Sequence, residues 1–145
     1  LTIGTLDGAN VEMQQACGAD NIFIFGHTAT EVDEIWKSGY SSSNYYRGNV
    51  RLEKVIRALN EGFNGVAFGD IANYLLYGTP VADPYMCMAD FGSYFATHNR
   101  VDETYLDREK WAKMSLNNIA TAGFFAADRS IKDYADNIWG LKRID

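Results

Sequence analysis

The chain has little of several features that commonly identify a function. Of its 145 residues only two are cysteine and two are proline, and the net charge is −6. The cysteines form no CxxC pair, so neither a disulfide framework nor a metal site of the usual spacing is indicated. No lysine or arginine cluster is present, which argues against nucleic-acid binding. The longest apolar runs, such as IFIF at 22–25, are too short to span a bilayer, so we expect no membrane segment.

The sequence also lacks the local patterns that carry familiar chemistry. Neither GxxxxGK[ST] nor GxGxxG occurs, and no lysine lies in an apolar context that would lower its pKa for a Schiff base. His27 and His98 have no serine, cysteine or carboxylate at a catalytic sequence spacing, so we expect surface or capping roles. We expect Cys17 and Cys87 to be buried thiols of a cytoplasmic protein. We therefore predict no catalytic residue and no metal ligand on this chain.

Apolar and aromatic residues are abundant instead. The hydrophobic fraction is 47% and the aromatic fraction 14%, enough for a core, with some aromatic side chains left to face a partner. The chain starts on the strand-like LTIGT rather than on methionine, and we expect a fragment or a processed chain.

The first 39 residues alternate between strand and helix signals. LTIGT (1–5) and NIFIFG (21–26) read as strands, and a helix is expected over 7–17. A capping box at 28–31 then starts a second helix, which ends before Gly39. Two short strands joined by a helix form a parallel pair, so the fold class is α/β.

The remainder is mostly helical. We expect helices near 50–63 and 70–75, a turn over TPVADP at 79–84, and a third strand over YMCMAD at 85–90. The expected helix caps are Asp70, Asp90, Asp107 and either Asp128 or Ser130. Three strands would leave sheet edges uncovered by so many helices, so we expect further strands upstream of the chain.

The opening stretch TLDGANVE allows three interpretations. Asp7-Gly8 is a hairpin-turn signal, but Asp7 could also cap the following helix, or the glycines could cradle a phosphate. A carboxylate at a helix N-terminus occupies the place an anion would take. The residues therefore favour the helix cap over the phosphate cradle.

Longer motifs resemble one family. LTIGTLDGANVEM, NIFIFG, the GY at 39–40 and the YY at 45–46 are similar to the glycogen and maltodextrin phosphorylases. Trp111 and the closing NIATAGFFAADRSIKDYADNIWG at 118–140 resemble the end of the same α-1,4-glucan phosphorylases in residue identity and order. The likeness covers essentially the whole chain and is loosest over 64–106.

The resemblance implies a fold and an activity. Members resemble two Rossmann-like domains of glycosyltransferase-B type, and residues 1–145 would be the C-terminal part of the second domain, a partial doubly wound sheet ending in a crossover helix at 129–139. The parent enzyme would degrade storage glucan with inorganic phosphate to glucose 1-phosphate. It would carry pyridoxal 5′-phosphate on a lysine upstream of Leu1. Its partners would be its own N-terminal domain and a second copy in a homodimer.

The same resemblance places the opening turn. It would lie near the cofactor as a wall of the pocket, formed by Gly4, Thr5, Asp7, Gly8 and Asn10, while the isolated chain would be inactive. The alternative is a stand-alone α/β module that binds a sugar or nucleotide without catalysis. A third reading is a helical interaction protein.

Overall fold

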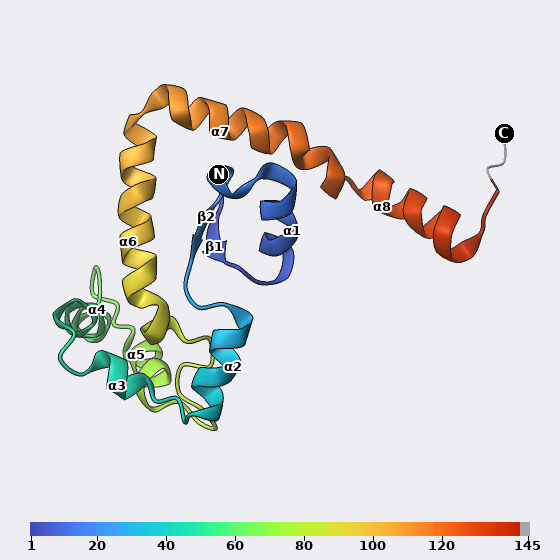
Figure 1. Cartoon of the computed structure of the whole chain (residues 1–145). Coiled ribbons are helices and arrows are strands. Elements are labelled where there is room, and N and C mark those ends of the chain that lie inside the picture. Colours follow the sequence, from blue (N-terminus) through green and yellow to red (C-terminus); the bar gives the residue numbers. More distant parts are fainter. Residues whose placement is uncertain (143–145) are drawn as a thin grey trace.

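The computed structural model describes residues 1–142 and opens with a strand–helix–strand unit (Figure 1). Strand β1 (Ile3–Thr5) is followed by helix α1 (Gly8–Cys17), the short 3-10 turn η1 (Ala19–Asn21) and strand β2 (Phe23–Phe25). The strands pair in parallel, Ile3 opposite Phe23 and Thr5 opposite Phe25. The two expected strands, the helix between them and their parallel pairing are thus confirmed. Figure 1 shows α1 on one side of the strand pair and the long helix α6 (Cys87–Leu106) on the other.

Helix α2 (Ala29–Lys37) follows the second strand directly. The Thr28 side chain accepts the backbone N–H of Glu31, and the Glu31 carboxylate accepts the N–H of Thr28, the reciprocal pattern of a capping box. These two backbone N–H groups at the helix start are thereby satisfied, as the capping-box pattern in the sequence predicted.

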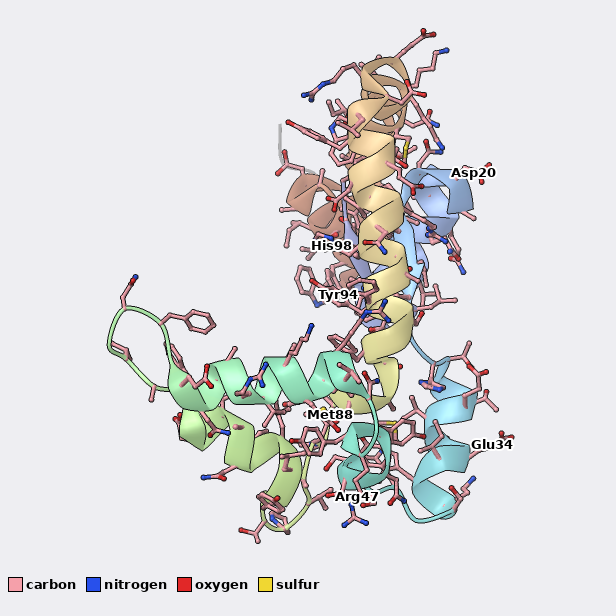
Figure 2. All side chains as sticks on the ribbon, turned by 90° about the vertical axis from the view of Figure 1, so that its left-hand side faces the viewer. Asp20, Glu34, Arg47, Met88, Tyr94 and His98 are labelled. Atoms are coloured by element: carbon pink, nitrogen blue, oxygen red, sulfur yellow. The ribbon has the colours of Figure 1, made fainter. Side chains whose placement is uncertain are left out.

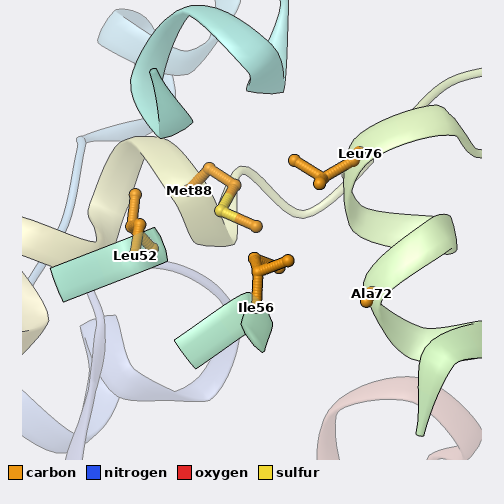
Figure 3. Close-up of a cluster of buried hydrophobic side chains, with 5 residues drawn as sticks. All are labelled: Leu52, Ile56, Ala72, Leu76 and Met88. Carbon is orange, nitrogen blue, oxygen red and sulfur yellow. The ribbon is translucent and has the colours of Figure 1, made fainter. Parts of the chain in front are cut away.

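Three short helices pack around an apolar cluster. They are α3 (Ser42–Tyr46), α4 (Val50–Glu61) and α5 (Gly69–Tyr77). Asn49 caps α4, its side-chain oxygen accepting from the N–H groups of Arg51 and Leu52. Side chains of α4, α5 and the start of α6 meet in the core shown in Figure 3, namely Leu52, Ile56, Ala72, Leu76 and Met88.

The predicted third strand is wrong. Residues 85–90 lead into α6 (Cys87–Leu106), a helix of 20 residues, so the described sheet has two strands rather than three. The buried Asp83 carboxylate accepts the backbone N–H groups of Cys87 and Met88, which starts the helix before Asp90 is reached. Asp90 therefore lies within the first turn of α6 and does not cap it.

The last elements extend away from the body. Helix α7 (Arg108–Thr121) begins at Asp107, whose side chain accepts the N–H of Lys110 as expected. The 3-10 turn η2 (Ala122–Phe125), α8 (Ala127–Tyr134) and the π-helical turn η3 (Ala135–Trp139) follow and project outward in Figure 1. We call residues 122–142 the C-terminal arm.

Two further cap predictions and one burial prediction are wrong. Helix α5 starts after Phe68 with Asp70 in its first turn, and α8 starts after Ala126, so neither Asp128 nor Ser130 is its cap residue. Cys17 is buried but Cys87 is exposed, and both are free thiols.

Within residues 1–142, no helix is long and apolar enough to cross a membrane. The expected domain included residues 143–145, which lie outside the described residues.

Candidate functional site

The carboxyl ends of the two parallel strands lie at one edge of the sheet. Thr5 and Phe25 are register partners, so the loop that follows each strand starts from the same edge. In α/β folds this edge is where ligands bind. The β1–α1 turn and the β2–α2 connection together form the candidate site.

Asparagine fixes the first of these loops. The Asn10 side-chain amide donates to the carbonyl of Thr5 at 2.9 Å, and the Asn10 backbone N–H donates to the carbonyl of Asp7 at 3.0 Å. A Cβ added at Gly4 would lie 2.5 Å from the Asn10 amide nitrogen, so only glycine permits this close approach. Four of the predicted wall residues, Gly4, Thr5, Asp7 and Asn10, are thus joined in one turn.

The predicted cap at Asp7 is right in position and wrong in its bond. Asp7 precedes α1 with an extended backbone, yet its side chain makes no capping hydrogen bond. Gly8 opens the helix at φ +46°, a left-handed conformation that favours glycine. A helix follows rather than a returning strand, which excludes the hairpin interpretation. Asp7 and Gly8 are exposed, whereas Gly4, Thr5 and Asn10 are half-buried.

Asp90 fixes the second loop. One of its carboxylate oxygens accepts the His27 backbone N–H at 2.9 Å and lies 2.6 Å from the His27 ring Nδ1. The neighbouring Gly26 N–H donates to the Ser93 hydroxyl at 2.9 Å. Gly26 has φ +81°, and a Cβ there would meet the Asp90 carboxylate at 2.7 Å. Helix α6 is thereby attached to the end of β2.

The two histidines therefore have different surroundings. His27 is paired with a carboxylate that is only 7% exposed and comes from a position 63 residues away, so no local spacing revealed it. His98 is an exposed residue in α6, 3.5 Å from Asp102 one turn later, which fits the expected surface role. The sequence did signal Asp90 as a helix-start residue, but not as the partner of a histidine.

A second buried carboxylate, that of Asp83, contacts Tyr40 in the loop between α2 and α3. The Tyr40 hydroxyl donates to Asp83 Oδ2 at 2.6 Å, and Asp83 itself is fully buried. Burial, followed by the hydrogen bond to Asp83 and its negative charge, raises the pKa of Tyr40 far above its ordinary value. Desolvation of the thiol and the same carboxylate raise the pKa of Cys87, although the residue as a whole is exposed. The Asp83 hydrogen bonds attach the start of α6 to the loop between α2 and α3.

The described lysines do not fit attachment of a carbonyl cofactor. All six are exposed side chains, namely Lys37, Lys54, Lys110, Lys113, Lys132 and Lys142. A Schiff-base lysine needs desolvation or a cationic neighbour that lowers its pKa, and the Asp136 carboxylate instead raises the pKa of Lys132. Among residues 1–142, no group of three His, Cys, Asp or Glu side chains is arranged to hold a metal ion.

Comparison with known proteins gives one consistent result. The profile of the family described as carbohydrate phosphorylase matches residues 1–141. The chain is 42% identical over 146 residues to a glycogen phosphorylase of Synechocystis, an alignment that covers 99% of this chain and 17% of that protein. It is 42% identical over 144 residues to a glycogen phosphorylase of Haemophilus influenzae, covering 99% of this chain and 18% of that protein.

A human relative has the same extent of similarity. The chain is 40% identical over 149 residues to the liver form of glycogen phosphorylase from Homo sapiens, covering 100% of this chain and 17% of that protein. The chain thus spans roughly a sixth of the length of the curated relatives it matches, 17% to 18%.

Proposed function

We propose a function from one premise: the chain belongs to the carbohydrate phosphorylase family. On this basis the chain is part of an α-1,4-glucan phosphorylase, a glycosyltransferase that cleaves storage glucan with inorganic phosphate and releases glucose 1-phosphate. The observation that carries the proposal is the match over residues 1–141 together with relatives called glycogen phosphorylase at 38–42% identity.

Within that enzyme we assign the chain to the C-terminal part of the second, Rossmann-like domain. Residues 129–139 would be the crossover helix toward the N-terminal domain, and the intact enzyme would be a cytoplasmic homodimer. The exposed apolar side chains of the arm support the proposal that this helix packs against a partner, because Ile138 and Trp139 are 66% and 57% exposed. The two parallel strands are compatible with such a sheet.

The cofactor proposed for the intact enzyme is pyridoxal 5′-phosphate, which would supply acid–base chemistry through its phosphate group. The exposed lysines described above do not fit its attachment, so the lysine would be supplied from outside this chain. What this chain would contribute is the wall of the site, through Gly4, Thr5, Asp7, Gly8 and Asn10. The Asn10–Thr5 hydrogen bond supports the assignment because it fixes the turn at the ligand-binding edge of the sheet.

Expression of the chain alone and with its upstream coding sequence tests the activity. We expect the longer protein to form glucose 1-phosphate from maltoheptaose and phosphate, and the isolated 145-residue chain to form none and to show no pyridoxal absorbance. Turnover by the isolated chain, or none by a folded longer protein, would overturn the proposal.

The wall assignment has its own test in the longer protein. Replacing Asn10 by Ala frees the turn, and since misplacement by an ångström can cost about 100-fold, we expect kcat to fall by roughly 10- to 100-fold. Asn117→Ala, in an exposed position of α7, is the matched control. Unchanged kcat in a folded Asn10→Ala enzyme would contradict the wall assignment and leave the activity proposal standing.

A further inference from the structure

A small hollow lies at the corner where α2 ends and α3 begins. Its volume is about 320 Å³, within the lower range of small-molecule sites. The backbone of Gly39, at φ +87°, forms the bend. The side chains around it are those of Ile35, Ser38, Tyr40, Ser41, Asn44 and Tyr45.

The lining carries no formal charge. It offers two serine hydroxyls, an asparagine amide and two tyrosine rings, with one isoleucine as the apolar contact. Figure 2 shows Glu34, one of the three acidic residues of α2, projecting on the side of the helix away from α3. Because the lining has no charged side chain to pair with an ion, its hydroxyl and amide groups suit a neutral ligand rich in hydroxyl groups.

The aromatic side of the hollow is fixed before any ligand arrives. The Tyr40 hydroxyl is held by the buried Asp83 carboxylate at 2.6 Å, so the ring cannot turn freely. Trp36 packs edge-on against Tyr40, with ring centroids 5.0 Å apart. The Tyr45 ring also packs against Tyr40, with centroids 5.6 Å apart. Because the rings are already ordered, binding would lose little side-chain entropy.

The polar side is available for hydrogen bonds. Ser41 precedes α3, yet its side chain makes no capping bond, and within residues 1–142 the Asn44 amide makes no side-chain hydrogen bond. The Ser38 hydroxyl donates to the carbonyl of Ile35 and keeps its lone pairs free to accept. Hydroxyl and amide groups of this kind both donate and accept, as a sugar hydroxyl requires.

We propose that this corner is a second carbohydrate site, which binds a glucosyl unit of an α-1,4-glucan at the surface of the domain. The Tyr40 and Tyr45 rings supply apolar surface for the sugar ring, and Ser38, Ser41 and Asn44 bind its hydroxyls. The choice of an α-1,4-glucan rests on the proposed function, whereas the choice of a neutral sugar rests on the lining alone. The site would hold the polymer and perform no chemistry.

Titration of the full 145-residue chain with maltotetraose, followed by amide NMR shifts, tests the proposal. We expect saturable shifts confined to the residues around Gly39–Tyr45, and smaller or unsaturated shifts with the isomer cellotetraose. Asn44→Ala combined with Ser41→Ala should weaken maltotetraose binding at least 5-fold. Both positions are exposed, so the fold should persist, and Asn117→Ala is again the matched control.

Three outcomes would overturn the site. They are the absence of saturable shifts at the corner, shifts centred on other residues, and equal affinity of the double variant and the parent chain. Equal binding of maltotetraose and cellotetraose would overturn the α-1,4-glucan assignment. None of these outcomes touches the phosphorolysis assay on the longer protein, so failure of this site and failure of the proposed function remain distinguishable.

Discussion

At the scale of single residues, the Asp83 carboxylate accepts hydrogen bonds from both backbone and side-chain donors. One carboxylate oxygen accepts the Cys87 N–H, while the other accepts the Met88 N–H and the Tyr40 hydroxyl. These bonds satisfy a fully buried charge and begin α6, so a buried carboxylate is stable here only because three donors surround it.

Replacing Tyr40 by Phe should destabilise the chain by about 1–3 kcal/mol at pH 7, since a charge-assisted hydrogen bond is lost. The raised pKa adds a pH dependence. The folded state binds the phenol proton more tightly, so this stabilisation is complete below the ordinary pKa of about 10 and is lost as pH rises above it. Urea unfolding between pH 8 and 11 measures both effects.

Comparison of the two proteins provides the control. The unsubstituted chain should lose stability above about pH 10 more steeply than Tyr40→Phe, because only the unsubstituted chain carries the hydroxyl whose pKa is raised. Parallel pH profiles for the two proteins would show that the Tyr40 proton does not contribute.

At the scale of secondary-structure elements, the small helices depend on their shared core. Leu52 and Ile56 of α4 are 2% and 4% exposed, and they meet α5 and α6 in the cluster of Figure 3. Helices of 9 and 12 residues are marginal alone, so packing supplies most of their stability.

Ile56→Ala should therefore cost about 2–5 kcal/mol, the range for removing a buried branched side chain. Val55→Ala is the matched control, because Val55 is the preceding residue of α4 and is 40% exposed. The urea concentrations at the unfolding midpoints of the two variants, measured at pH 7, give the comparison. If Ile56→Ala is already unfolded without urea, the loss of stability is at the upper end of the expected range or beyond it. Equal midpoints would show that the cluster does not stabilise α4.

The same scale explains which elements could be predicted from sequence. The strand–helix–strand unit and the Thr28 capping box depend on neighbouring residues, so their patterns were sufficient. The short apolar stretch YMCMAD at 85–90 favoured a strand, but Asp83 satisfies the N–H groups that begin a helix. The site divides in the same way: the β1–α1 turn is local, whereas His27 and Asp90 meet across 63 residues. The role of that turn as a pocket wall stays a prediction.

At the scale of the whole molecule, the C-terminal arm stands out from the body by the apolar side chains that it exposes. The arm turns outward in Figure 1, and its large apolar side chains are exposed, among them Phe124, Ile131, Tyr134, Ile138 and Trp139. A contiguous exposed apolar surface marks an interaction site or an aggregation liability.

The isolated chain should therefore associate with itself in a concentration-dependent manner. Deleting residues from Ala127 onward removes α8 and η3, whose main contacts are with each other and with η2, so the body should stay folded. Sedimentation velocity at several concentrations should show less association for the shortened chain. A monodisperse full chain, or equal association of the two chains, would contradict this prediction.

The bonds from α6 to β2 also impose an order on synthesis of the chain. Asp90, Ser93 and Thr97 reach back to His27, Gly26 and Ile24. At about 5–20 residues per second a ribosome needs roughly 3–15 s to pass from β2 to these positions, and β2 stays uncovered meanwhile. Nascent chains stalled near Glu61 should thus be cleaved by protease within 21–27, and chains stalled near the C-terminus should resist. Equal cleavage of both would show that α6 does not protect the strand.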